Sequence, residues 1–156
     1  MSILHFPAAL PDGALAGRAP TAPTPVAAPP AALPPTRRQT LAQVVVCLGC
    51  CCGRTDRGRP EVPSDWLKAE WKGRKLLKHV QLTISGCLGP CDVPNVVAVH
   101  SAAGSVWLHH LTERAHFEAL VAWAAACAGA GTVLPLPALL AAHAFDRFAP
   151  PPASRA

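Results

Sequence analysis

The sequence predicts a single α/β domain, a small mixed sheet of about four strands flanked by helices, in the middle of the chain. Segments with the apolar periodicity of strands and helices alternate only between residues 41 and 128. This middle segment holds four of the 18 prolines, whereas residues 1–40 hold nine and residues 129–156 hold five. Long alternating segments and few prolines together indicate where the folded part lies.

The two ends of the chain are expected to behave differently from the middle. Residues 1–40 are mostly Ala, Pro and Thr, which offer too little apolar surface to offset the entropy of a free chain. We therefore predict a disordered Pro/Ala-rich arm over 1–40, the folded domain over 41–128, and a Pro-rich tail over 129–156. Within that tail, residues 136–148 have the composition of a short helix whose apolar side chains could dock on the domain.

The first half of the domain reads as a strand, a loop and a helix. Gln43–Val46 is a β-branched run typical of a buried strand, and a glycine-rich loop follows over residues 48–62. Pro63-Ser64-Asp65 has the capping serine and early acid of a helix start. This helix is predicted to run to about Lys78, with its large apolar residues on one side: Trp66, Leu67 and Trp71.

The second half reads as a strand, a hairpin and a helix. Apolar and polar residues alternate over His79–Ser85, which is the period of a half-buried strand. Residues 95–100 and 105–109 flank a turn and predict a hairpin. Thr112 is the expected cap of a last helix, whose apolar residues recur at helical spacing: Phe117, Leu120, Val121, Ala124 and Ala128.

The predicted order of elements brings two cysteine-containing loops together. The connection between the first two strands is long enough to make them parallel neighbours. Each of these strands is followed by a cysteine loop, and the carboxyl ends of parallel strands lie at the same edge of a sheet. We therefore expect the two loops to form one site.

Six of the seven cysteines lie in these two loops. The first loop region has Cys47 and the triplet Cys50-Cys51-Cys52, and the second has Cys87 and Cys91, whereas Cys127 is expected to be a small buried residue of the last helix. Four thiolates suit a structural zinc ion, a 2Fe-2S cluster or two disulfides. Zinc ribbons usually place two residues between paired cysteines, but three separate Cys87 from Cys91, and this favours the wider loops of a binuclear cluster.

One segment carries a resemblance to a known family. Ser85-Gly86-Cys87-Leu88-Gly89-Pro90-Cys91-Asp92-Val93-Pro94-Asn95-Val96-Val97 resembles the second half of the cluster motif in thioredoxin-like 2Fe-2S ferredoxins, which include the small iron-sulfur subunit of respiratory complex I. The likeness covers roughly Gln43 to Cys127. It implies a thioredoxin-like fold and a 2Fe-2S cluster held by Cys47, Cys52, Cys87 and Cys91. Cys51 keeps a three-residue gap to Cys47 and is the expected substitute for Cys52, whereas Cys50 is expected to be spare.

The cysteine triplet departs from ordinary members of that family. Cys50-Cys51-Cys52-Gly53-Arg54-Thr55-Asp56 looks like a subgroup of stand-alone bacterial ferredoxins that are often encoded near cobalamin-synthesis genes. This likeness implies service in cobalamin or other metal-cofactor metabolism. The same loop has three arginines, Arg54, Arg57 and Arg59, and at least one of them is expected to raise the reduction potential of a cluster or to guide a partner.

Composition narrows the classes of function. The formal net charge of +5 is too mild for a nucleic-acid-binding protein, and no stretch approaches the roughly 18 apolar residues of a membrane span. We expect a cytoplasmic electron carrier without a catalytic site of its own, whose partners are redox proteins and which could pair with a second copy of itself. The alternatives are a structural zinc-binding module and a thiol-disulfide redox protein that uses Cys47 and Cys50.

Overall fold

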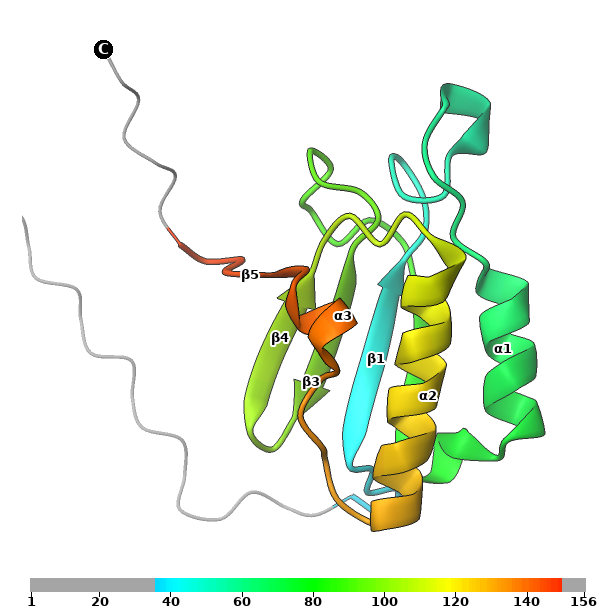
Figure 1. The fold of residues 1–156 in the computed structure, drawn as a ribbon, viewed down its shortest axis with the longest axis vertical. Coiled ribbons are helices and arrows are strands. Elements are labelled where there is room, and N and C mark those ends of the chain that lie inside the picture. Colours follow the sequence, from blue (N-terminus) through cyan, green and yellow to red (C-terminus); the bar gives the residue numbers. More distant parts are fainter. Residues whose placement is uncertain (1–35, 150–156) are drawn as a thin grey trace, which may run out of the picture. The chain divides into compact units, whose positions relative to one another are not determined.

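The computed structural model describes residues 36–149 and shows a mixed α/β domain (Figure 1). Most of the arm predicted for residues 1–40 therefore lies outside the described residues, namely positions 1–35. The end of the predicted tail, positions 150–156, lies outside them too. The elements follow in the order β1 (Ala42–Cys47), η1 (Thr55–Arg57), α1 (Ser64–Gly73), η2 (Leu76–Lys78), β2 (Val80–Ser85), β3 (Val97–Ser101), β4 (Gly104–Leu108), α2 (Arg114–Ala130), α3 (Ala138–Ala141) and β5 (Ala144–Phe145).

The sheet has five strands in the order β2-β1-β3-β4-β5. Strand β1 lies between β2 and β3, parallel to the first and antiparallel to the second, and the long connection through α1 permits its parallel pairing with β2. The register places Cys47, the last residue of β1, opposite Ser85, the last residue of β2. Both cysteine loops consequently leave the sheet at the same edge.

The core lies between one face of the sheet and the helices α1 and α2. Figure 1 shows the two helices side by side, and Arg114 at the start of α2 stacks its guanidinium 3.7 Å from the ring centre of Trp66 in α1. The predicted face of α2 is confirmed, because Phe117, Leu120, Val121 and Ala124 are all buried. On the other face of the sheet, Gln43 donates a hydrogen bond to Thr83 in an exposed position.

Both long helices begin or end differently from the prediction. Helix α1 stops at Gly73 rather than Lys78, because Lys75 takes a left-handed φ of 57° and the chain continues as the short 3-10 helix η2. Ser64 is the first residue of α1 rather than its cap, and Pro63 precedes it. Helix α2 is capped by Glu113 rather than Thr112, since Glu113 and His116 satisfy each other's backbone N–H groups in a capping box.

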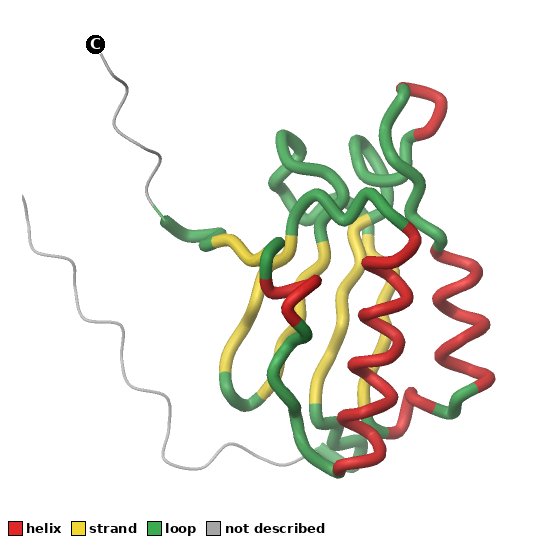
Figure 2. The backbone as a smooth tube through the Cα atoms, viewed as in Figure 1, coloured by secondary structure: helices red, strands yellow, loops and turns green. Residues whose placement is uncertain are grey.

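The folded unit extends past the boundary expected at Ala128 (Figure 2). The helix expected within residues 136–148 is the single turn α3, and Leu140 in it is fully buried. The strand β5 then pairs with β4, which gives the sheet a fifth strand that the sequence analysis did not predict. A two-residue strand is too short to produce a recognisable alternation, so its pairing is visible only in the structure.

Candidate metal centre

The two cysteine loops touch each other at the carboxyl edge of β1 and β2. The parallel pairing continues one residue beyond the strands, where the Leu48 N–H donates to the carbonyl of Ser85 at 3.0 Å. A β-carbon placed on Gly49 would lie 3.7 Å from the backbone nitrogen of Cys87. The sheet register therefore fixes the first loop against the start of the second.

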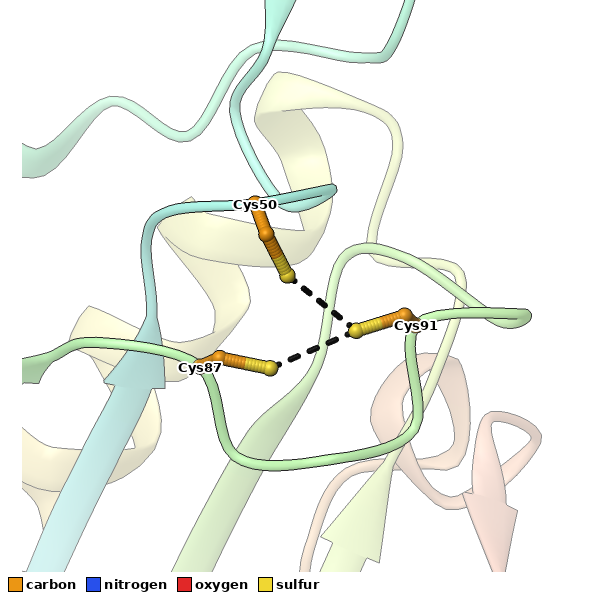
Figure 3. Close-up of side chains that lie close together, drawn as sticks. All are labelled: Cys50, Cys87 and Cys91. Atoms are coloured by element: carbon orange, nitrogen blue, oxygen red, sulfur yellow. Dashed lines mark hydrogen bonds between the residues drawn. The ribbon is translucent and has the colours of Figure 1, made fainter.

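Three thiols from these loops converge on one point, as Figure 3 shows. The Sγ atom of Cys91 lies 3.2 Å from that of Cys50 and 3.3 Å from that of Cys87. All three Sγ atoms lie within 4.8 Å of one another, and the cysteines are free thiols. Within residues 36–149 this is the single group of three or more His, Cys, Asp or Glu side chains close enough to hold a metal ion.

The second loop owes its tight curvature to Gly89. This residue has a φ of +113°, a conformation that side chains with a Cβ rarely adopt. The turn is closed by the Cys91 N–H, which donates to the carbonyl of Gly89 at 2.8 Å. The bend returns the chain on itself and turns the thiols of Cys87 and Cys91 toward each other.

The pKa of the Cys91 thiol is raised above its usual range. The largest cause is the hydrogen bond with Cys50, followed by the hydrogen bond with Cys87. Three close thiols resist ionisation because each new thiolate would repel the sulfurs beside it. A bound cation removes that penalty, so metal binding at this group must displace protons.

The remaining cysteines have other surroundings. Cys47 and Cys52 belong to the hydrophobic core, with 3% and 2% of their surfaces exposed. Burial and a hydrogen bond with Cys47 raise the pKa of Cys52 to about 12. Cys51 is half-buried, and Cys127 is buried on α2, where its sulfur accepts the Leu134 N–H at 3.2 Å.

The exposed group thus contains half of the ligand set that the resemblance implies. Cys87 and Cys91 are in it, whereas Cys47 and Cys52 are not, and Cys50 occupies the position expected of a first-loop ligand. The sequence contains a signal for Cys50, namely the spacing Cys47-Leu48-Gly49-Cys50, whose two intervening residues are typical of metal-binding pairs. The same spacing is also that of a thiol-disulfide pair, and the sequence was interpreted only in that sense.

Asn95 is a residue of the site that sequence reasoning did not single out. Its side chain is fully buried and accepts the Gly53 N–H at 2.9 Å. Its amide donates to three backbone carbonyls, those of Pro60, Glu61 and Leu111, at 3.1 to 3.2 Å. Asn95 therefore ties the end of the second cysteine loop to the end of the first.

The arginines of the first loop are placed differently from one another. Arg54 donates two hydrogen bonds to Asp56, at 2.7 and 2.6 Å, and this pairing lowers the pKa of Asp56. The pKa of Arg54 is raised, chiefly by its hydrogen bond with Asp56 and to a smaller extent by Cys50 and Cys51. Arg57 and Arg59 are exposed.

Comparisons with known proteins add no relative. No model of a known protein family matches the chain, and no curated protein matches its sequence. Among the described residues, no helix combines the length and apolar character needed to cross a membrane.

Proposed function

We propose that this chain is a single-electron carrier that binds one 2Fe-2S cluster, in the manner of thioredoxin-like ferredoxins. The observation that carries the proposal is the convergence of Cys50, Cys87 and Cys91 from two loops at one sheet edge. Thiolates are the ligands that iron-sulfur clusters and zinc select in proteins. Such a cluster, when bound, supplies a centre that takes up and releases one electron.

The fourth thiolate is assigned to Cys47. Cys47 is the last residue of β1 and pairs with Ser85 at the end of β2. It lies two positions before Gly49, the residue of the first loop that approaches the backbone of Cys87. Cys51 is a weaker candidate because it adjoins Cys50, and it is not among the three thiols that converge. Cys52 is buried as deeply as Cys47, and it is set aside because Cys50 of the same triplet already lies beside Cys91.

The topology also supports this proposal. A parallel pair β1-β2, followed by the antiparallel hairpin β3-β4 beside β1, is the arrangement expected for a thioredoxin-like domain from the predicted order of elements. In this arrangement two loops emerge beside each other at the carboxyl ends of β1 and β2. These two loops carry five of the seven cysteines, and a sixth, Cys47, is the last residue of β1.

The chain's own residues give the site two properties that electron transfer needs. Leu48 and Leu88, one in each loop, pack against the hydrophobic core and so anchor both loops to the domain. Cys50 and Cys87 are exposed, so a redox partner can approach the site directly. We propose that the protein acts through such partners, without a catalytic site of its own, in the cytoplasm, where cysteines remain reduced.

One observation favours a second candidate, a structural zinc site. The three Sγ atoms lie within 4.8 Å of one another, a spacing that also suits a single tetrahedral ion. Zinc lacks redox chemistry, so the two candidates predict different properties for the purified protein.

The test is metal and sulfide analysis of protein purified without oxygen. The proposal expects equal amounts of iron and acid-labile sulfide, about two of each per chain, and a reddish-brown colour that bleaches on reduction. A colourless protein with stoichiometric zinc and no sulfide would establish the zinc site instead.

A further inference from the structure

A guanidinium from the C-terminal segment lies against the second cysteine loop. A β-carbon placed on Gly89 would lie only 2.7 Å from Nη2 of Arg147. Gly89 is the middle residue of the loop between Cys87 and Cys91, two positions from each. Arg147 therefore brings a positive charge to the backbone that carries two of the three converging thiols.

The fold holds Arg147 in this place through its neighbours in sequence. Phe145 in β5 pairs with Trp107 in β4, and their rings are 6.4 Å apart, edge to face. Directly after β5, the Asp146 carboxylate accepts the N–H groups of residues 148 and 149, at 2.8 and 3.1 Å, which fixes the turn around Arg147. The guanidinium also lies 6.0 Å from the ring centre of Trp107.

Within the described part of the chain, Arg147, like Arg57 and Arg59, lacks the acidic partner that three other arginines of the domain have. Arg54, Arg74 and Arg114 each pair with a carboxylate, on Asp56, Glu70 and Glu118 respectively. No carboxylate among residues 36–149 lies within 4.0 Å of the Arg147 guanidinium. Its charge is therefore free to act on the cysteine loop that it contacts.

We propose that Arg147 supplies positive charge to the metal centre. This is the role that the sequence suggested for arginines of the first loop, Arg54, Arg57 and Arg59. The effect of Arg147 on a reduction potential rests on the proposed function. The presence of its positive charge beside the Cys87–Cys91 loop does not, because it requires no cluster. A cation beside a thiolate-bound cluster stabilises its more negative, reduced form. The C-terminal segment thereby becomes part of the redox site.

The first experiment needs no cluster. Full-length protein, reduced and stripped of metal by a chelator, is alkylated at low ionic strength with iodoacetate or with iodoacetamide, and modification of Cys87 and Cys91 is followed by mass spectrometry. Both reagents attack the same thiolate, so the ratio of their rates reports the local charge and cancels any change in thiol ionisation. We expect Arg147→Gln to lower the iodoacetate-to-iodoacetamide ratio about threefold, and salt to abolish the difference.

Two further variants guard against a purely structural explanation. Arg147→Lys keeps the charge and should preserve most of the ratio, whereas Arg57→Gln removes an exposed arginine of the other loop and should leave the ratio unchanged. An unchanged ratio in Arg147→Gln, or an equal fall in Arg57→Gln, would overturn the placement of the charge.

The second experiment measures the midpoint potential of cluster-loaded protein. The proposal expects a more negative potential in Arg147→Gln than in the parent and in Arg57→Gln, with recovery in Arg147→Lys. If all four proteins bind zinc and no cluster, the proposed function fails, and the alkylation ratios still decide whether Arg147 faces the thiols. If the cluster forms and its potential is the same in all four, Arg147 does not act on it.

Discussion

Cys50 and Cys52 are two positions apart in the same triplet, yet they lie in different surroundings. Cys50 is exposed and lies 3.2 Å from Cys91, sulfur to sulfur, whereas Cys52 is 2% exposed within the core. Of the triplet, Cys50 is therefore the member that lies beside the two thiols of the second loop. The structure thus separates two ligand sets that differ in one residue, Cys50 in place of Cys52.

Single serine substitutions distinguish these two sets. We expect Cys47→Ser, Cys50→Ser, Cys87→Ser and Cys91→Ser to lose or strongly weaken cluster binding, measured as iron and sulfide bound per chain. Cys51→Ser is the matched control in the same loop and should retain the cluster, as should Cys52→Ser. Retention in Cys50→Ser together with loss in Cys52→Ser would restore the set implied by the resemblance.

Asn95 is the residue on which the shape of the site depends most. Its side chain makes four hydrogen bonds to backbone groups of three segments, and it is fully buried. Removing it leaves several buried N–H and C=O groups without partners, each of which is costly.

The expected effect of Asn95→Ala is a loss of about 3 kcal/mol in the free energy of unfolding, measured by urea denaturation. Gln43→Ala is the control, since Gln43 makes one side-chain hydrogen bond on the exposed face of the sheet, and it should cost at most about 0.5 kcal/mol. Equal losses in the two variants would show that the Asn95 network does not hold the loops together.

Among the elements, those after α2 are docked on the domain by contacts that the sequence did not predict. Leu140 in α3 is fully buried, the Trp123 indole in α2 donates to the carbonyl of Leu134 at 2.8 Å, and the His109 N–H donates to the carbonyl of His143 at 2.9 Å. These contacts lead from α2 through α3 to β5. They hold the segment that carries Arg147.

Neighbouring leucines of α3 test this packing. Leu140→Ala should lower the free energy of unfolding by about 2 to 4 kcal/mol, because it leaves a cavity in the core. Leu139→Ala changes the same residue type where the side chain is 46% exposed, and should cost at most about 0.5 kcal/mol. Denaturation curves that coincide for Leu140→Ala and the parent would mean that α3 does not dock.

The elements that the sequence predicted well are those with a long, regular pattern. The β-branched run of β1, the alternation of β2 and the apolar face of α2 each repeat often enough to be recognised. The end of α1 was predicted too late, since Lys75 in its left-handed conformation carries no signal in its residue type. The strand β5 could not be predicted, because two residues show no period.

At the scale of the whole molecule, the sequence predicted that two cysteine loops would meet, and it could not predict which thiols would face each other. Parallel β1 and β2 dictate the meeting of the loops, whatever side chains they carry. Which thiols converge depends on the conformation of the loop after Cys47 and on the bend at Gly89, both of which are tertiary properties. For the same reason the contact of Arg147 with Gly89, 58 positions apart in sequence, could not be seen in the sequence alone.

If the chain holds a centre that accepts one electron, as proposed, the reduced protein contains an unpaired spin. Protein purified without oxygen is measured by electron paramagnetic resonance before and after reduction with dithionite, with Cys87→Ser as the reference. We expect no signal before reduction and, after it, the signal of about one unpaired electron per chain, absent from Cys87→Ser. A fully reduced, metal-replete protein that remains without any signal would contradict the account.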